Sequence, residues 1–222
     1  MTAAVLFDLD GTLADTAPDL AAALNLLLLE EGREPLALSI LRPHVSGGAR
    51  GLIRIGFGLS PDDANFAALV SRFLAHYQDS LCAGTVLFPG ILDLLEAIEE
   101  RDIKWGIVTN KAQRFTLPLI EQLGLRQRTA CIVSGDTALR PKPNPAPLLL
   151  ACAVLQVAPE KSIYVGDDLR DIDAGRSAGL FTATAAYGYL GGDQPFENWQ
   201  ADAIINAPSE ILGLLGSHVR MN

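Results

Sequence analysis

Six short apolar runs along this chain are the feature that most constrains its fold. They are rich in β-branched residues and hold few polar side chains, which is typical of strands buried on both faces of a parallel sheet. They predict strands at Ala4–Phe7, Trp105–Thr109, Ala130–Val133, Ile163–Val165, Thr182–Ala186 and Ala203–Ile205. Such a sheet needs helices against both of its faces.

Helical patterns lie between these runs from residue 86 onward. They are the Leu92–Glu99 stripe, Phe115–Leu123 with a stop at Gly124, a helix that Asn144 and Pro145 open, and Asp171–Ala178 with a stop at Gly179. Glycine after a helical stripe and proline in its first turn are the usual end and start signals. Because strands alternate with helices, the sequence predicts an α/β fold with a doubly wound, Rossmann-like parallel sheet.

Residues 15–83 break this alternation, because their patterns are helical only. The predicted helices are Leu20–Glu30, Leu41–Gly56 and Asp63–Leu81. A helical block placed directly after the first strand lies above the carboxyl end of that strand, where open α/β sheets bind their ligands. We therefore predict an all-α cap domain over residues 15–83, inserted into an α/β core made of residues 1–14 and 84–222.

Two aspartates, Asp8 and Asp10, stand two residues apart where the first strand gives way to Gly11. Residues i and i+2 of a strand point to the same face, so these carboxylates are expected to project together and to repel each other without a cation nearby. Hard oxygen ligands suit Mg²⁺. A calcium loop would need Gly and Glu where this chain has Leu13 and Asp19. The pair predicts a magnesium site.

Polar residues also follow later strands. They are Thr109 and Asn110, then Lys142 in the proline-rich loop 140–145, then Asp167, Asp168 and Asp171. The carboxyl ends of parallel strands meet at one edge of a sheet, so these residues are expected around one cavity. Taken singly, Thr109–Asn110 could be a turn, Lys142 a solvated loop residue and Asp171 a helix cap. Their order along the chain is what points to a shared site.

This order of motifs, DxDGT, Thr-Asn after a strand, Lys in a proline-rich loop and GDDxxD, resembles the haloacid dehalogenase superfamily of phosphotransferases. The helical block resembles the subclass with an α-helical cap. The resemblance implies a Mg²⁺-dependent phosphomonoesterase that works through an aspartyl-phosphate intermediate. It implies that Asp8 is the nucleophile and Asp10 the general acid and then base. It also implies that Thr109 and Lys142 hold the phosphoryl oxygens, and that Asp167 binds Mg²⁺.

The metal site implied by the resemblance consists of Asp8, Asp10 and Asp167. Asp168 and Asp171 would either bind through water or orient the ligands, and the sequence leaves that choice open. A carboxylate that attacks a phosphate dianion meets charge repulsion, which a divalent cation and a nearby ammonium would reduce.

Substrate contacts are expected from Gly11 and Asn110 in the core and from Gly47, Gly48 and Arg50 in the cap. Within the family, four runs resemble bacterial phosphoglycolate phosphatase-like enzymes, and especially N-acetylmuramic acid 6-phosphate phosphatases: Ser46–Arg50, Val108–Phe115, Val165–Ile172 and Tyr187–Tyr189. Both substrates carry a carboxylate, for which Arg50 offers a planar guanidinium. A surface arginine in a helix connection is the alternative interpretation of Arg50.

A sugar phosphomutase of the β-phosphoglucomutase type shares all four motifs and stays an alternative function. A dehalogenase has no use for the second acid, Asp10. A phosphonate hydrolase of this family would need a lysine in the cap, and residues 15–83 contain none. A non-catalytic binding module is disfavoured because no acid or lysine of the motifs is missing.

The net charge of −9 opposes binding to nucleic acid or to an anionic membrane. No apolar run is long enough to span a bilayer. Three cysteines, Cys82, Cys131 and Cys152, lack metal-ligand spacing and favour a reducing compartment. We expect a cytoplasmic protein whose partner is a small phosphate ester, and both a monomer and a homodimer fit the sequence.

Overall fold

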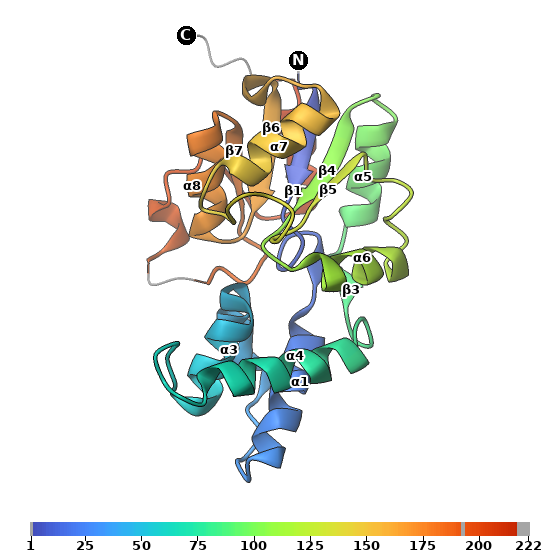
Figure 1. The fold of residues 1–222 in the computed structure, drawn as a ribbon. Helices are drawn as coiled ribbons and strands as arrows, with labels where there is room; N and C mark the ends of the chain where they lie inside the picture. Colours follow the sequence, from blue (N-terminus) through green and yellow to red (C-terminus); the bar gives the residue numbers. More distant parts are fainter. Residues whose placement is uncertain (1, 192–193, 217–222) are drawn as a thin grey trace.

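In the part of the chain that the computed structural model describes, residues 2–191 and 194–216, six parallel strands form the central sheet (Figure 1). Their order is β5-β4-β1-β6-β7-β8. The strands are β1 (Ala4–Phe7), β4 (Lys104–Val108), β5 (Cys131–Val133), β6 (Ser162–Gly166), β7 (Phe181–Ala185) and β8 (Ala203–Ile205). Each predicted strand lies within one residue of an observed one, and the predicted doubly wound α/β fold is confirmed.

Helices cover both faces of the sheet because the side chains of β1 alternate between two cores. Val5 and Phe7 pack in one core, and Ala4 and Leu6 pack in the other, all of them fully buried. The helices against the first face are α5 (Ile91–Glu99), α6 (Gln113–Gln122) and α9 (Ile211–Leu214), and those against the second are α7 (Ala146–Leu155) and α8 (Leu169–Ala178). The apolar pattern of β1 thus positions its carboxyl end between two layers of helices.

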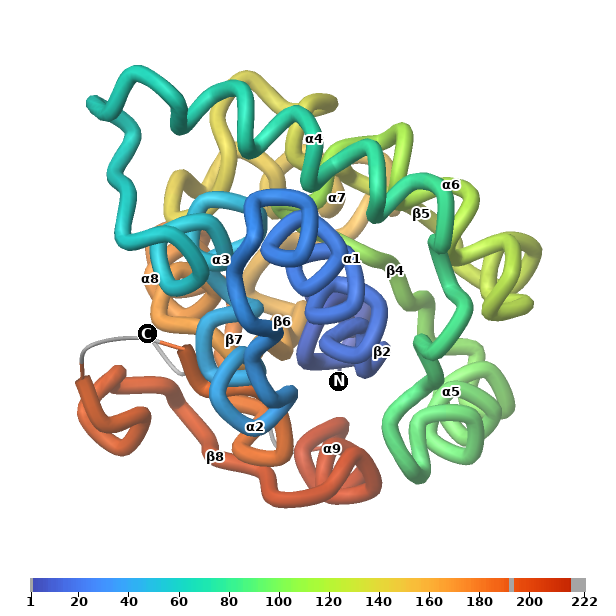
Figure 2. Tube along the Cα trace, turned by 90° about the horizontal axis from the view of Figure 1, so that it is seen from below, coloured from blue at the N-terminus to red at the C-terminus, as the bar shows by residue number. Residues whose placement is uncertain are grey.

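A helical insert separates two short strands, β2 (Ala14–Asp15) and β3 (Val86–Leu87). It comprises α1 (Ala17–Glu30), α2 (Leu38–Leu41), the 3₁₀ helix η1 (Arg42–Gly47), α3 (Gly48–Phe57) and α4 (Phe66–Asp79). Figures 1 and 2 show α1, α3 and α4 beyond the carboxyl edge of the sheet. The helical pattern predicted over Leu41–Gly56 contains the glycine-rich segment Ser46–Arg50, and the helix breaks there: Gly48 has a φ of 59° and a ψ of −153°, which no α-helix accommodates.

The helical insert has an apolar core of its own. Leu24 and Leu27 of α1, Leu52 and Ile53 of α3 and Phe73 of α4 are fully buried in one cluster. This cluster is distinct from the two clusters on the faces of the sheet. A cap domain needs such a core to fold as a separate unit. The bounds 15–83 of the cap stay a prediction.

A buried carboxylate ties the outgoing and returning chain together where the helical insert joins the sheet. Asp19, in the first turn of α1, is 4% exposed. It accepts hydrogen bonds from the Gly84 amide (2.6 Å), the Thr85 amide (3.0 Å) and the Thr85 hydroxyl (2.6 Å). Next to it, β2 pairs antiparallel with β3. Sequence inspection did not identify this contact, which joins residues 65 or 66 positions apart.

Tyr189, from the loop after β7, caps the first helix of the insert. Its hydroxyl accepts hydrogen bonds from the amides of Thr16 (2.7 Å) and Ala17 (2.9 Å) and donates to Asp15 Oδ1 (3.0 Å). Thr16 stands at the N-cap of α1 and makes no side-chain cap with any described residue. A phenol from the core therefore satisfies the Thr16 amide, and it is the nearer of two acceptors for the Ala17 amide, which also lies 3.4 Å from Asp15 Oδ1.

Two expectations from composition concern the membrane and the thiols. Among residues 2–191 and 194–216, every helix is too short or too polar to cross a lipid bilayer. The cysteines are free; Cys131 and Cys152 are buried, and Cys82 is partly exposed.

Replacing Asp19 with alanine should lower the free energy of unfolding by about 2–3 kcal/mol, because three donors lose a charged acceptor and the buried Thr85 hydroxyl is left unpaired. Urea unfolding measures this. Asp62→Ala is the control, since Asp62 is exposed in the loop before α4. Equal midpoints for both variants would contradict the assigned role of Asp19.

Candidate active site

The carboxyl edge of the sheet holds a cavity of about 60 Å³. From the core it is lined by residues that the sequence singled out: Asp8, Asp10, Thr109, Asn110, Lys142, Asp168 and Asp171. Ser46 and Gly48 of the helical insert complete its wall. Residues from β1, β4, β6 and the loop before α7 thus meet at one place, as parallel topology predicts.

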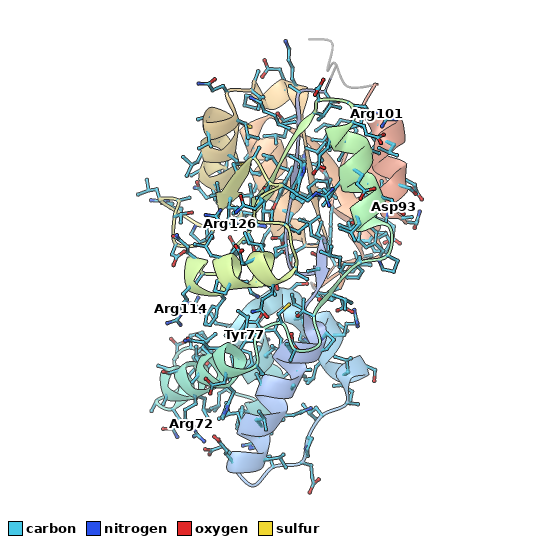
Figure 3. All side chains as sticks on the ribbon, turned by 90° about the vertical axis from the view of Figure 1, so that its right-hand side faces the viewer. Arg72, Tyr77, Asp93, Arg101, Arg114 and Arg126 are labelled. Carbon is cyan, nitrogen blue, oxygen red and sulfur yellow. The ribbon has the colours of Figure 1, made fainter. Side chains whose placement is uncertain are left out.

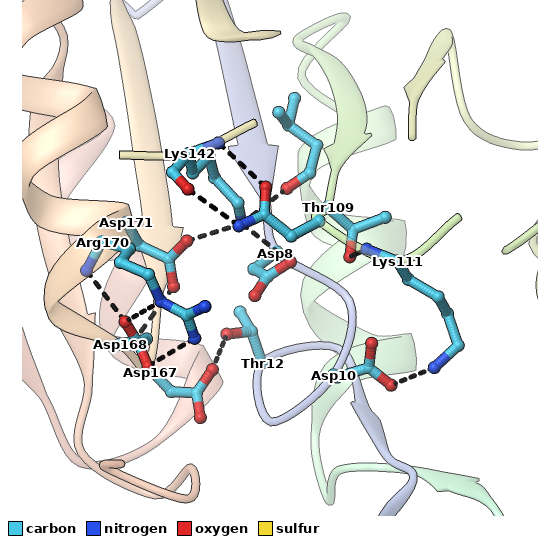
Figure 4. Close-up of polar contacts among 12 residues, drawn as sticks. Asp8, Asp10, Thr12, Thr109, Lys111, Lys142, Asp167, Asp168, Arg170 and Asp171 are labelled. Atoms are coloured by element: carbon cyan, nitrogen blue, oxygen red, sulfur yellow. Dashed lines mark hydrogen bonds and ion pairs between the residues drawn. The ribbon is translucent and has the colours of Figure 1, made fainter. Parts of the chain in front are cut away.

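Three buried acids, Asp8, Asp167 and Asp171, form what we call the acid cluster (Figure 4). Each offers one carboxylate oxygen within 4.8 Å of the others. The pKa of Asp8 is raised to about 7: burial raises it most, Lys142 lowers it, and the charges of Asp171 and Asp10 raise it. Burial, with the charges of Asp8 and Asp171, also holds the pKa of Asp167 well above its usual range.

The acid cluster fits a magnesium ion. Asp8 Oδ1 is buried, lies 3.0 Å from Lys142 Nζ and receives no well-aligned hydrogen bond from any described residue. Three carboxylates face one ammonium there, so a divalent cation with oxygen ligands would relieve their repulsion. Asp8 and Asp167 are the residues that would hold it, with Asp171 as the third acid within reach.

Asp167 is held from three sides. Its Oδ1 accepts a hydrogen bond from the Thr12 hydroxyl (3.1 Å), and its Oδ2 accepts one from the Tyr189 amide (3.0 Å) and a longer one from Ser46 Oγ (3.4 Å). Gly11 packs directly against it: its φ is 83°, and a Cβ there would lie 2.1 Å from Asp167 Oδ2. Glycine at position 11 is therefore required by the acid beside it.

The carboxylate of Asp10 lies apart from the acid cluster (Figure 4). Its Oδ1 accepts hydrogen bonds from Lys111 Nζ (2.8 Å) and Thr16 Oγ1 (2.6 Å). The prediction that Asp8 and Asp10 project together assumed a continuing strand, but β1 ends at Phe7 and the alternation stops there. Asp10 was predicted among the metal-binding acids, and the structure brings its side chain to a lysine.

Lys111 is a site residue that sequence reasoning missed. Its side chain is 7% exposed and lies 4.8 Å from the centre of the Tyr77 ring of α4. Burial alone would lower the pKa of Lys111, but Asp10 and Tyr77 together, through charge and hydrogen bonding, outweigh burial and hold this pKa above its ordinary value. The available signal was its position directly after Thr109 and Asn110.

Lys142 is 3% exposed and held by a network. Its Nζ donates to Asp171 Oδ1 (2.6 Å), to the Tyr164 hydroxyl (2.7 Å) and to the Val108 carbonyl (3.1 Å). The Asn110 side chain bonds the backbone of Lys142 twice, as donor and as acceptor, at 2.9 Å each. Asn110 thereby positions the lysine loop. Tyr164 was also missed; a phenol inside an apolar strand was its signal.

The structure separates the two acids whose roles the sequence left open. Asp171 belongs to the acid cluster. Asp168 caps α8 by accepting from the Arg170 amide (2.9 Å), which is why α8 begins at Leu169, two residues before the predicted start. The Arg170 guanidinium bonds both Asp168 oxygens (2.7 and 2.9 Å) and donates to the Ser46 carbonyl (2.5 Å). Asp168 thus acts through an arginine that reaches the helical insert.

The remaining predicted contacts are spread around the cavity. Thr109 is 3% exposed and lines it, and its Oγ1 accepts from the Lys111 amide (3.1 Å). Gly48 lines it from the insert, while Gly47 faces a neighbouring groove. Arg50 is exposed on α3 and does not line the cavities described beside the acid cluster.

Comparisons of the sequence and of the fold with known proteins both find haloacid dehalogenase-like phosphatases. Residues 5–185 match the haloacid dehalogenase-like hydrolase family. The chain is 42% identical to an N-acetylmuramic acid 6-phosphate phosphatase of Pseudomonas putida over 214 residues, which are 96% of both chains. It is 44% identical to a phosphoglycolate phosphatase of Xanthomonas campestris over 209 residues, which are 94% of both chains.

Among solved structures, a predicted phosphoglycolate phosphatase from Haemophilus somnus superposes with a TM-score of 0.85 at 26% identity. The match covers 96% of this chain and 97% of that one. A putative phosphoglycolate phosphatase from Lactobacillus delbrueckii, with a TM-score of 0.85 at 23% identity, shares the fold.

Magnesium should stabilise this protein more at pH 8 than at pH 5.5. Without metal, the unfolded chain releases the protons of Asp8 and Asp167 near pH 4, whereas the folded protein keeps them to higher pH, about 7 for Asp8, because both pKa values are raised. Its stability therefore falls as pH rises through that range. Mg²⁺ needs these carboxylates deprotonated, so protons compete with it.

Thermal unfolding with and without Mg²⁺ at both pH values measures the stabilisation. When Mg²⁺ is present at 100 times its Kd, it should raise the free energy of unfolding by about 2.7 kcal/mol. Asp167→Asn should remove most of the increment at pH 8, and Asp62→Asn should keep it. Equal increments at both pH values would show that Mg²⁺ does not bind at the acid cluster.

Proposed function

This chain belongs to the haloacid dehalogenase-like hydrolase family and is a phosphatase, and we propose that it acts with Mg²⁺ through an aspartyl-phosphate on Asp8. The proposed substrate is a small phosphate ester that carries a carboxylate, N-acetylmuramic acid 6-phosphate or 2-phosphoglycolate. One observation carries the proposal: a buried carboxylate, Asp8, lies 3.0 Å from a buried ammonium, Lys142, in a cavity that also contains a second acid, Asp10.

Asp8 is the proposed nucleophile. A carboxylate oxygen of Asp8 attacks phosphorus and forms a new P–O bond, while the bond from phosphorus to the ester oxygen breaks. The Lys142 ammonium offsets the negative charge that gathers on the phosphoryl oxygens. Mg²⁺, when bound, would supply further positive charge to the same oxygens. Lys142 stays protonated in this role because Asp171 and Asp8 outweigh burial and raise its pKa.

Asp10 is the proposed proton carrier. The hydrogen bonds that described residues give to its carboxylate end on Oδ1, so Oδ2 is the atom that exchanges a proton with the substrate. Asp10 first gives this proton to the departing alkoxide. It then takes one from the water that attacks the phosphorus of phospho-Asp8, which releases inorganic phosphate and restores both acids. Lys111 and Thr16 fix the orientation of Asp10 during both steps.

The substrate class rests on the relatives named above, whose two substrates both combine a phosphate with a carboxylate. A phosphate-release screen over small phosphate esters with Mg²⁺, including both candidates, tests it. We expect a clear kcat/KM preference for one of the two acids over esters without a carboxylate. Release of free phosphate also separates hydrolysis from a phosphomutase, which returns the phosphoryl group to the sugar. A preference for esters without a carboxylate would overturn the proposed substrate class.

Asp8→Asn should lower kcat by about a thousandfold or more on every phosphate ester, because the amide is a poor nucleophile and the covalent intermediate is lost. Steady-state phosphate release measures this. Asp168→Asn is the matched acid: the side chain of Asp168 is paired with Arg170 and is not one of the three acids of the cluster, so the loss of activity should be much smaller. Retained activity in Asp8→Asn would remove Asp8 from the nucleophile role.

The Asp10→Asn variant should show burst kinetics with 4-nitrophenyl phosphate. Nitrophenolate leaves without a proton, so Asp8 is still phosphorylated and one equivalent of nitrophenol per site appears rapidly. Water attack then lacks its base, and turnover falls by about 10²–10⁴. Stopped-flow absorbance measures both phases. Slow nitrophenol release without a burst would mean that Asp10 acts before phosphoryl transfer, contrary to the proposed role.

A further inference from the structure

A second cavity, of about 210 Å³, adjoins the first one. Asp10, Gly48 and Asn110 line both cavities. The second cavity lies between the helical insert and the start of α6. Its further lining includes Phe73, Leu74 and Tyr77 from α4, and Lys111, Arg114 and Phe115 from the core.

The position of Asp10 decides what this second cavity can hold. Under the proposed function, the phosphoryl group lies in the first cavity beside Asp8 and Lys142. Asp10 gives its proton to the leaving oxygen, so the leaving group must extend from phosphorus on the side of Asp10. The second cavity is on that side and is more than three times larger than the first.

The walls of the second cavity differ in chemistry. Phe73, Leu74 and Tyr77 form an apolar face that would pack against carbon atoms of a ring. On the core side, Lys111 is already paired with Asp10. Arg114 is exposed, lies with its guanidinium carbon 4.6 Å from the centre of the Phe115 ring, and forms no ion pair within residues 2–191 and 194–216.

Figure 3 shows Arg114 and Tyr77 at the level where α6 faces α4. An arginine without an acidic partner at the wall of a ligand cavity suits a carboxylate, because its planar donors bind both oxygens. Arg50, the arginine singled out by sequence, does not line this cavity. Arg114 is therefore the better placed of the two cations.

We propose that the second cavity binds the leaving group of the substrate, that this group is of sugar size, and that Arg114 binds its carboxylate. The inference rests on the proposed function and narrows it. Glycolate offers one methylene to the apolar wall and leaves most of the cavity unfilled. An N-acetylated sugar with a lactyl ether covers the face formed by Phe73, Leu74 and Tyr77 and carries a carboxylate to Arg114.

A comparison of two esters tests the contribution of the substrate carboxylate. N-Acetylmuramic acid 6-phosphate and N-acetylglucosamine 6-phosphate differ in the lactyl ether that carries it. The readout is the ratio of their kcat/KM values. We expect wild type to favour the first ester, and Arg114→Ala to lower the ratio by about tenfold or more, as the loss of a charge-assisted contact predicts. Arg114→Lys should recover part of it. Arg126→Ala, an exposed arginine beyond α6, is the control and should keep the wild-type ratio.

Several outcomes would overturn this inference while the proposed function stands. One is an equal loss on both esters in Arg114→Ala with an unchanged unfolding temperature, which indicates a role unrelated to the carboxylate. Another is a fall of the ratio in Arg50→Ala alone. A third is a higher wild-type kcat/KM for 2-phosphoglycolate than for N-acetylmuramic acid 6-phosphate. Absence of phosphate release from all these esters would instead overturn the proposed function itself, and this inference with it.

Discussion

Like charges buried at one edge of a sheet are the constraint on which the rest of this structure depends. Asp8, Asp167 and Asp171 lie within a few ångströms of each other, out of water, with Lys142 as the cation among them. Isolated charges are costly to bury, so each must be hydrogen-bonded or paired. The surrounding residues supply hydrogen bonds to these charges: Tyr164 accepts from the lysine ammonium, and Asn110 bonds the backbone of its loop. The carboxylates of the acid cluster still outnumber the single ammonium, and a divalent cation that also binds a phosphate would balance them.

The same cluster is connected to the helical insert. The Tyr189 amide donates to Asp167, while its hydroxyl accepts from the first amides of α1. The Arg170 guanidinium contacts both the Asp168 carboxylate and the Ser46 carbonyl in η1 of the insert. Tyr189 therefore joins the acid cluster to the insert, and the Asp168–Arg170 pair joins the start of α8 to it. Two cavities follow from this arrangement, a small charged one over the acids and a larger one with an apolar face beside it.

Much of the fold and part of the site could be predicted from the sequence. Buried strands are nearly free of polar residues, so β1, β4 and β6 could be identified from the sequence. Parallel topology then predicts that Asp8, Lys142 and Asp167 lie at one edge of the sheet. The helical pattern over Leu41–Gly56 did not show where its helices begin and end, because the backbone conformation of Gly48 that divides them is not determined by helix propensity. The contacts of Lys111, Tyr164 and Tyr189 could not be predicted, because their partners are distant in the chain or lie on another element.

The sequence by itself determined the sheet, the helical block after the first strand and the identity of the acids, because these depend on local pattern and on the order of the strands. Only the tertiary structure decided which partner each acid has. Asp8 and Asp10 are two residues apart, yet the strand ends at Phe7, so one carboxylate turns to Lys142 and the other to Lys111. Those lysines come from the ends of other elements, 101 residues beyond Asp10 in the case of Lys111. Spacing along the chain cannot determine a partner that folding brings from so far away.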